Sequence, residues 1–169
     1  MEALEAIMTR RSIRRYTSRE VAPAQIRRIL KAAMNAPSAN NLQPWHFVII
    51  HDRGTLEEIT TFHQYARMLR EAPVAIAVCA DTGKQNLEGY WVQDCAAATQ
   101  NMLLAAHALG LGAVWLGIFP REPRIEGMRR LLKLPEHITP FCVVAMGWPD
   151  EIVEPASRFQ EDRIHTDTW

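Results

Sequence analysis

The amino-acid sequence predicts a single domain of mixed helix and sheet, on three observations. A chain of 169 residues, 48% of them hydrophobic, is long enough to bury one sizeable core. Patterns with a helical period alternate with runs of β-branched and aromatic residues, in the order α-α-β-α-β-α-β-α-β. No internal repeat and no linker divides the chain, so we expect one domain over residues 1–169.

The first third of the chain contains two helical patterns and one strand pattern. Residues 2–9 have a short amphipathic pattern. Pro23 suits the first turn of a second helix, and Pro37 ends it. The aromatic and β-branched run at 45–50 predicts a strand. In the second helix, the apolar side chains recur at the spacing of one buried face: Ile26, Ile29, Leu30, Ala33 and Met34.

The rest of the chain predicts three more helices and three more strands. The run Thr55-Leu56-Glu57-Glu58 is a capping-box pattern that starts a helix, which Ala72-Pro73 ends. Gly110 is a natural C-terminal cap for the long helix before it. In chain order, the remaining elements are a strand at 74–79, a helix at 90–109, a strand at 113–118, a helix at 125–132 and a strand at 141–146.

The last segment, residues 148–169, has no periodicity and is acidic, with six Asp or Glu against two Arg over residues 150–169. It nevertheless contains Phe159, Ile164 and Trp169, which a disordered tail would seldom carry. We therefore expect an extended C-terminal tail that docks on its own domain or on a partner subunit.

Composition excludes several classes of function. Zero formal net charge argues against nucleic acid as a partner. The cysteines at 79, 95 and 142 lie in apolar surroundings without CxxC spacing, and His46 and His51 lack partners at metal-ligand spacing. We therefore expect buried thiols and no metal site. No signal peptide is visible and no run approaches the ~18 apolar residues of a membrane span, so we expect a cytoplasmic protein with no membrane partner.

Three stretches are candidates for binding chemistry, and each has an ordinary alternative. Residues 36–50, APSANNLQPWHFVII, place a stiff polar connection between a helix and a strand, where binding residues often lie. A plain connecting loop is the alternative. In the basic cluster, four arginines flank Ser12 within six residues, and guanidinium forks bind phosphate oxygens in bidentate fashion: Arg10, Arg11, Arg14 and Arg15. A solvated helix surface is the alternative there.

The third stretch, Gly112 to Gly117, ends a strand with an aromatic residue and a glycine. Glycine lets a flat ligand approach the backbone closely, whereas the alternative is a core strand with a terminal turn. Trp115 stands where a GxGxxG motif needs its third glycine, so a Rossmann site is disfavoured. GxxxxGK[ST], HExxH and GxSxG motifs are absent from the sequence.

Taken together, the three stretches resemble the nitroreductase family of FMN-dependent oxidoreductases. RRSIRRY resembles the family's opening phosphate-binding motif, PSANNLQPW its PSxxNxQPW segment, and GLGAVWLG its GLGxxWLG stretch. The matches follow the family's order and span roughly residues 4–165. The resemblance implies an α+β fold with a mixed, largely antiparallel sheet flanked by helices. It also implies an intertwined homodimer with two FMN sites at the subunit interface.

The resemblance assigns cofactor-binding roles residue by residue. The phosphate and ribityl chain would meet Arg10, Ser12, Arg14 and Arg158, with Arg11 giving mainly backbone contacts. The segment that reaches the flavin would be Pro37, Ser38, Asn41 and Gln43, its Pro-Ser part coming from the partner subunit. The isoalloxazine ring would lie near Trp115, Leu116 and Gly117, with a backbone amide facing its N5 atom.

Two departures from the family pattern stand out. Ala156 falls where some members carry a lysine, so the phosphate would be held by arginines alone. Some members also place an Asn and a Lys near the flavin pyrimidine, and here only Gln64 or Arg67 could replace them.

The implied activity is ping-pong reduction of a small electron-poor acceptor, such as a nitroaromatic, a quinone or free flavin, by NAD(P)H. The flavin carries the chemistry, and no side chain is expected as a catalytic acid or nucleophile. Two alternatives remain open. One is reductive dehalogenation or flavin fragmentation on the same fold, and the other is a non-catalytic flavin-binding or sensing dimer.

Overall fold

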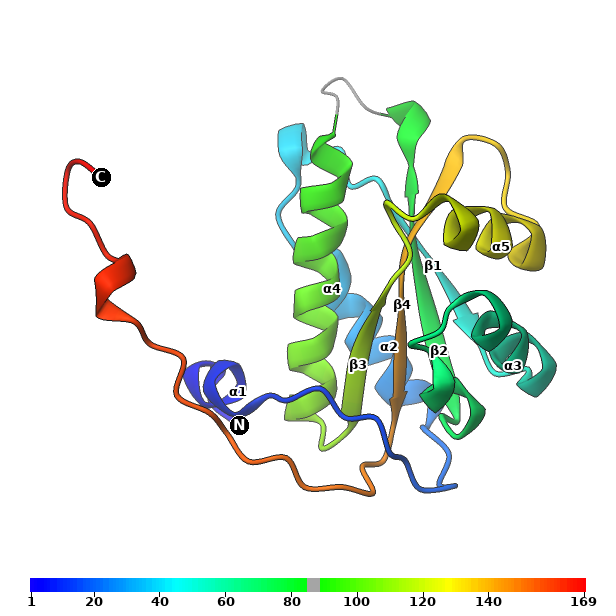
Figure 1. Cartoon of the computed structure of the whole chain (residues 1–169), viewed down its shortest axis with the longest axis horizontal. Helices are drawn as coiled ribbons and strands as arrows, with labels where there is room; N and C mark the ends of the chain where they lie inside the picture. Colours follow the sequence, from blue (N-terminus) through cyan, green and yellow to red (C-terminus); the bar gives the residue numbers. More distant parts are fainter. Residues whose placement is uncertain (85–88) are drawn as a thin grey trace.

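A four-stranded antiparallel sheet forms the centre of the computed structural model, which describes residues 1–84 and 89–169. The strand order is β1-β2-β4-β3, so β1 and β3 are the two edges (Figure 1). One short parallel bridge, from Ser12 to Ala113, makes the pairing mixed but largely antiparallel, as predicted. The strands are β1 (Trp45–Ile50), β2 (Val74–Asp81), β3 (Gly112–Gly117) and β4 (Ile138–Gly147).

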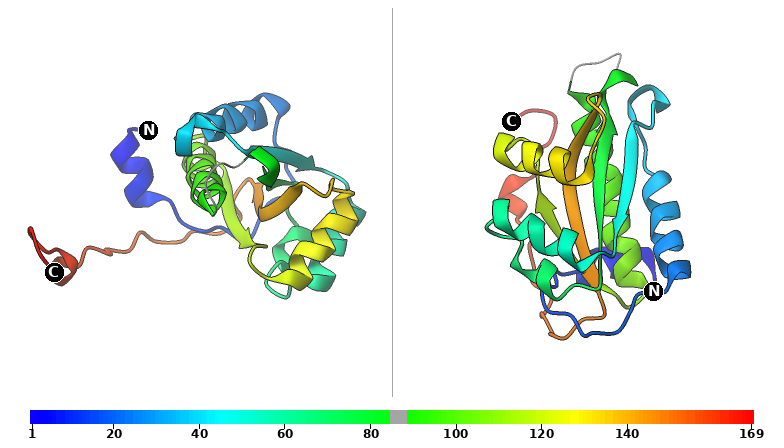
Figure 2. Two further views of the ribbon diagram at one scale, coloured as in Figure 1. Left: turned by 90° about the horizontal axis from the view of Figure 1, so that it is seen from above. Right: turned by 90° about the vertical axis from the view of Figure 1, so that its right-hand side faces the viewer.

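Helices cover both faces of this sheet (Figure 2). Helices α2 and α4 pack on one face, α3 and α5 on the other, and α1 lies beside the C-terminal half of α4. The helices are α1 (Ala3–Thr9), α2 (Pro23–Met34), α3 (Arg53–Phe62), α4 (Tyr90–Ala108) and α5 (Glu122–Leu132).

The sheet separates two hydrophobic cores because neighbouring side chains of a strand point to opposite faces. In β2, Val74, Ile76 and Val78 enter the core beneath α2 and α4, while Ala75 and Ala77 enter the core beneath α3 and α5. The three cysteines are free and fully buried, as predicted. Burial raises the pKa of the Cys79 and Cys95 thiols to about 12, so these thiols remain protonated and unreactive.

Several predicted boundaries are wrong. The helix predicted to continue to Ala72-Pro73 ends at Phe62, and a separate 3-10 turn, Arg67–Arg70, follows it. Helix α3 begins at Arg53 because Asp52, not Thr55, is the cap: its Oδ2 accepts from the Thr55 amide at 2.7 Å. Helix α5 begins at Glu122, with Pro123 in its first turn.

The last strand also begins earlier than predicted. Pro140 has no amide hydrogen to donate to a neighbouring strand, so the sequence predicts that the strand begins after it. In the structure, β4 accommodates Pro140 at a bulge. Val78 of β2 faces Cys142 and the next residue, Cys79, faces Pro140. The strand therefore continues back to Ile138.

The segment that follows α1 is held against the beginning of β3. The Ile13 amide donates to the Ala113 carbonyl at 3.1 Å. Tyr16 is buried, and its hydroxyl is shared between the carbonyl oxygens of Ile13, at 2.6 Å, and Ala145, at 3.2 Å. One phenol thus joins the N-terminal segment to β4.

Replacing Tyr16 by phenylalanine should destabilise the protein without changing its fold. The variant keeps the ring but leaves two carbonyls short of a donor, at a cost of about 1–3 kcal/mol in the free energy of unfolding. Urea unfolding measures the change, and Tyr90→Phe, at an exposed tyrosine, is the matched control. Equal stability of both variants would contradict this role for the Tyr16 hydroxyl.

Candidate functional site

The arginine cluster lies on the extended segment between α1 and Tyr16, not on a helix surface. The Arg11 guanidinium is turned toward the C-terminal tail, where it donates to the carbonyls of Glu154 and Ala156, each at 3.2 Å. It also donates to the Arg10 carbonyl at 2.6 Å. The Arg11 side chain therefore anchors the tail. Only the backbone of Arg11 is left for its predicted contact with a ligand.

The side chain of Arg10 is half-buried among other cations. Burial lowers the pKa of Arg10, and the neighbouring guanidinium groups of Arg11 and Arg158 lower it further. Arg158, which belongs to the tail, thus lies near the cluster, and its predicted contact with a phosphate stays a prediction. Converging cations repel one another unless an anion lies between them, and phosphate oxygens suit guanidinium donors.

Arg14 and Ser12 are the other two residues that the sequence predicts to contact the phosphate and the ribityl chain. The Arg14 side chain lies 3.4 Å from the Ser12 carbonyl. Glu151 binds the backbone amides of Arg14 and Arg15, the latter at 3.1 Å. The Glu151 carboxylate is therefore occupied by main-chain donors.

The edge of β3 continues from this cluster. Ala113 and Gly117 both direct their carbonyls to the outer edge, since Ala113 accepts from Ile13 and Gly117 accepts from residues outside the sheet. Trp115, two residues from each, has the same orientation, so its amide also faces outward. A Cβ atom placed on Gly117 would meet no heavy atom within 4 Å, which leaves room for a flat group.

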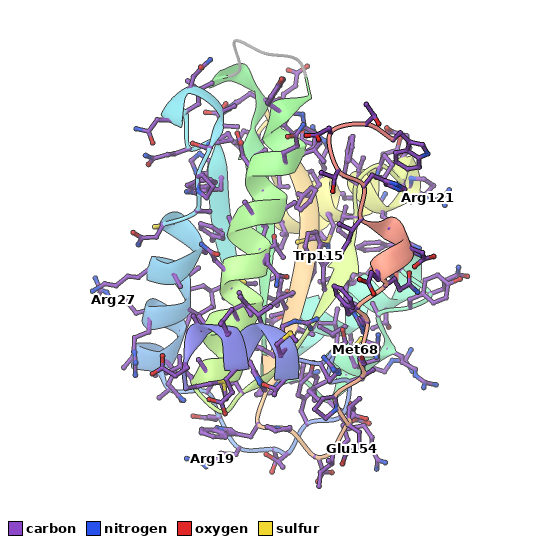
Figure 3. All side chains as sticks on the ribbon, turned by 90° about the vertical axis from the view of Figure 1, so that its left-hand side faces the viewer. Arg19, Arg27, Met68, Trp115, Arg121 and Glu154 are labelled. Atoms are coloured by element: carbon purple, nitrogen blue, oxygen red, sulfur yellow. The ribbon has the colours of Figure 1, made fainter. Side chains whose placement is uncertain are left out.

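The Trp115 ring is turned away from this edge. It packs edge-to-face on Phe141, with ring centroids 5.5 Å apart, and lies beside α4 (Figure 3). Leu116 is buried in the opposite core. The predicted contribution of Trp115 to a ligand site is therefore that of its backbone. The backbone of Leu116 faces β4, so the structure does not bring Leu116 to this edge.

Two residues that the sequence did not single out hold the end of β3. The Gly117 carbonyl lies 3.0 Å from Nε2 of His63 and accepts from the Arg124 guanidinium at 2.8 Å. The Tyr65 amide donates to Nδ1 of His63 at 3.3 Å, so the proton of this imidazole is on Nε2. His63 ends α3 and Arg124 lies in the first turn of α5, and no local motif marks either of them.

The loop that follows α2 is held by hydrogen bonds between its own residues. Its residues Asn40, Asn41 and Gln43 have φ values of 52°, 55° and 48°, a left-handed conformation that asparagine adopts more readily than most residues other than glycine. The Gln43 amide donates to the Ser38 hydroxyl at 3.0 Å, and its side chain donates to Asn41 Oδ1 at 2.8 Å.

Asp94, which the sequence analysis also missed, fixes this loop to α4. The side chain is 6% exposed, and its Oδ1 accepts from the Ala39 amide at 2.9 Å. Nothing in the sequence marks Asp94 apart from other helical acids. Pro37, Asn41 and Gln43 remain exposed on the far side of the loop.

One protomer does not bring all the predicted site residues together. The loop lies at the N-terminal part of α4, at Asp94, whereas the arginine segment lies at its C-terminal end, where Thr9 contacts His107 at 2.8 Å. A helix rises about 1.5 Å per residue, so these two points are roughly 20 Å apart. The candidate residues thus form two groups at opposite ends of α4.

The remaining candidates lie farther out. Gln64 is exposed beside Tyr65 on a cavity, and Arg67 is exposed at the start of a short 3-10 turn, Arg67–Arg70. Beyond Ala156 the tail leads away from the domain (Figure 1). Its apolar residues are among the most exposed of the described chain: Phe159 at 74%, Ile164 at 60% and Trp169 at 101%.

Two further features of the described residues bear on function. No three His, Cys, Asp or Glu side chains of residues 1–84 and 89–169 come close enough to hold a metal ion. Among the helices of the same residues, none has the length and apolar character needed to cross a membrane.

Comparison with known proteins gives consistent matches. The family model described as "Nitroreductase family" matches residues 7–64 and 62–148. A candidate NADH dehydrogenase/NAD(P)H nitroreductase of Methanothermobacter thermautotrophicus is 52% identical over 169 residues, covering 100% of this chain and 88% of the relative.

Solved structures agree with this match. The structure of a candidate NADH dehydrogenase/NAD(P)H nitroreductase of Parabacteroides distasonis superposes with a TM-score of 0.95 at 41% identity. The superposition covers 99% of this chain and 98% of the other. A candidate nitroreductase of Desulfovibrio desulfuricans, solved in complex with FMN, has a TM-score of 0.87 at 35% identity, covering 100% of this chain and 98% of the other.

Acidification should lower the stability of this site through His63. Burial and the nearby Arg124 lower the pKa of His63, so the unfolded chain binds a proton that the folded chain resists. The contribution of neutral His63 to the free energy of unfolding should be complete above about pH 6.5, the ordinary pKa of histidine. It should decrease as the pH drops below that value. Urea unfolding from about pH 8 to about pH 5 measures this dependence.

His63→Gln should have a shallower pH dependence than the parent protein. The dependence should not vanish, because burial and Arg10 also lower the pKa of His107. His46→Gln, at an exposed histidine of β1, is the control. An unchanged slope in His63→Gln would show that His63 is not the titrating group.

Proposed function

This chain belongs to the nitroreductase family, and from that premise we propose that it is an NAD(P)H-dependent flavin oxidoreductase with FMN as its cofactor. We propose nitroaromatics, quinones or similar electron-poor compounds as its acceptors, reduced by a ping-pong mechanism. The observation that carries the proposal is the convergence of Arg10, Arg11 and Arg158 beside the exposed edge of β3.

The arginine segment fits the phosphate end of the cofactor. Arg158 lies near enough to Arg10 to lower its pKa, and a dianionic phosphate would relieve the repulsion between the two guanidinium groups. Ser12 and Arg14 lie on the same segment and would serve the phosphate and the ribityl chain. The backbone of Arg11 completes this group, because its guanidinium is used by the tail.

The end of β3 fits the flavin ring. From Ala113, which pairs with Ser12, to Gly117 the strand extends about 13 Å at the rise of a β-strand. The outward amides of Trp115 and Gly117 would face the ring, and the space beside Gly117 would admit it. His63 and Arg124 bind the Gly117 carbonyl and so fix the orientation of this peptide before the ring arrives.

The protein's part in turnover is binding, orientation and exclusion of side reactions. When bound, FMN supplies the redox chemistry, taking up electrons from NAD(P)H and passing them to the acceptor. No side chain is proposed as a general acid or nucleophile, since solvent can supply protons. The two substrates would use the same face in turn, which requires no separate dinucleotide motif.

We propose a site shared between two protomers. Because the loop group lies roughly 20 Å along α4 from the arginine group, Pro37, Ser38, Asn41 and Gln43 would complete the site of the second copy. The exposed apolar residues of α1 and of the tail suit a large intertwined contact: Leu4, Ile7, Met8, Phe159, Ile164 and Trp169. Residues 1–169 would then be one domain whose tail, 148–169, docks on the partner.

Purified protein should contain FMN and consume NAD(P)H. A flavin absorption band near ~450 nm and steady NAD(P)H oxidation with a nitroaromatic or a quinone are the expected results. Product analysis under oxygen would distinguish acceptor reduction from flavin fragmentation. Flavin without turnover would favour a sensing dimer, and a colourless monomer that takes up no FMN would contradict the whole proposal.

Mixed dimers test whether the site is shared. Arg10→Ala and Asn41→Ala should each weaken FMN binding about tenfold or more, with the dimer intact by sedimentation. When the two variants are co-expressed with different tags and the mixed dimer is isolated, one of its two sites has both wild-type groups. This dimer should regain about half of the FMN. No recovery would show that each site lies within one protomer.

A further inference from the structure

A polar cavity of about 680 Å³ lies between the end of α3 and the beginning of α5. Its described lining offers two guanidinium groups, a carboxamide and three hydroxyls, and it includes no carboxylate. The lining residues are Thr60, Thr61, Phe62, Gln64, Tyr65, Arg121, Pro123 and Arg124.

One arginine of the cavity is held in place by the protein. Arg124 is half-buried, donates to the Gly117 carbonyl at 2.8 Å, and places its guanidinium carbon 5.8 Å from the centre of the Tyr65 ring. A further guanidinium, from Arg70, donates to the Thr60 hydroxyl at 3.3 Å. Arg124 therefore places a fixed positive charge in the lining of the cavity, and Arg70 adds a second one behind Thr60.

The second arginine has no partner. Arg121 caps α5 with its backbone, but within residues 1–84 and 89–169 no group accepts a hydrogen bond or ion pair from its side chain. Glu122 follows it in the chain and does not line the cavity. An exposed guanidinium on the rim of a polar cavity is available to an oxyanion.

The cavity adjoins the proposed ring end of the cofactor site, not the phosphate end. Arg124 belongs to the cavity lining and to the Gly117 contact, and His63 joins the same carbonyl to the backbone of Tyr65. Arg10 lies beyond the other end of β3, where Ser12 pairs with Ala113, and Ala113 is itself about 13 Å from Gly117 at the rise of a strand. The cofactor phosphate and the arginine cavity are therefore separate anion sites.

We propose that this arginine cavity binds an anionic group carried by a substrate, with Arg121 as the specificity-determining residue. The inference rests on the proposed function, because it places the substrate over the end of β3. The oxyanion would be either a carboxylate of the acceptor or the 2′-phosphate of NADPH. Both would accept hydrogen bonds from Arg121 and Gln64 while Arg124 contributes its charge.

Paired substrates that differ in one charge test the proposal. The acceptors are 4-nitrobenzoate and the neutral 4-nitrobenzyl alcohol, and the reductants are NADPH and NADH. For each pair, the measured quantity is kcat/KM for 4-nitrobenzoate divided by that for 4-nitrobenzyl alcohol, or kcat/KM for NADPH divided by that for NADH. In Arg121→Gln, one of these two ratios should fall about tenfold. Arg121→Lys should restore part of the ratio. Arg130→Gln, at an exposed arginine two turns along α5, should leave both ratios as in the parent.

Each outcome has one meaning. A fall confined to the nitrobenzoate pair identifies the acceptor, and a fall confined to the NADPH pair identifies the reductant. Unchanged ratios in both pairs would overturn the proposal. If the parent protein reduced neither acceptor, the proposed function would fail by itself. Calorimetric titration of 4-nitrobenzoate and of NADPH into the parent and into Arg121→Gln would then test anion binding in the cavity independently of turnover. Equal affinities of the two proteins for both compounds would overturn the proposal.

Discussion

The close contact between the N-terminal segment and the first residue of β3 is the constraint on which the rest of the site depends. Gly112 permits it, because a Cβ atom there would lie 2.6 Å from the Ile13 side chain. With this approach, Ser12 pairs with Ala113, and the arginines on either side of Ser12 take their place at one end of an edge strand. A larger residue at position 112 would push the N-terminal segment outward. The arginines around Ser12 would then be separated from the outer edge of β3.

The other end of the same strand is fixed by a different interaction. The Gly117 carbonyl would be an unpaired edge group, but His63 from the end of α3 and Arg124 from the start of α5 both satisfy it. Two helices on one face of the sheet are thereby joined to the edge of β3. The strand is thus held at both ends while the amides between them remain directed outward, which is the preorganisation that a flat cofactor requires.

Sequence patterns predicted the helices and strands well where the signal was local. The strand 45–50 matched to the residue, and Ile26, Ile29 and Ala33 of α2 are buried as their spacing predicts. Capping at Asp52 was missed although it is local, because the capping-box pattern that starts at Thr55 competes with it in the sequence, whereas the bulge around Pro140 depends on pairing with β2. His63, Asp94 and Arg124 were missed for a stronger reason: their partners are 54, 55 and 7 residues away, and only the folded chain brings them together.

The sequence is rich in arginine around Ser12 and acidic over residues 150–169, so the two ends of the chain could attract one another, or the arginines could attract an anionic ligand. In the structure the two ends contact one another, but each of these contacts joins a charged side chain to backbone groups. Glu151 binds the amides of Arg14 and Arg15, and the Arg11 side chain binds carbonyl groups. Neither contact neutralises Arg10, whose pKa is still lowered by burial and by its cationic neighbours. The acidic tail therefore brings Arg158 to the cluster and leaves the net positive charge for a ligand.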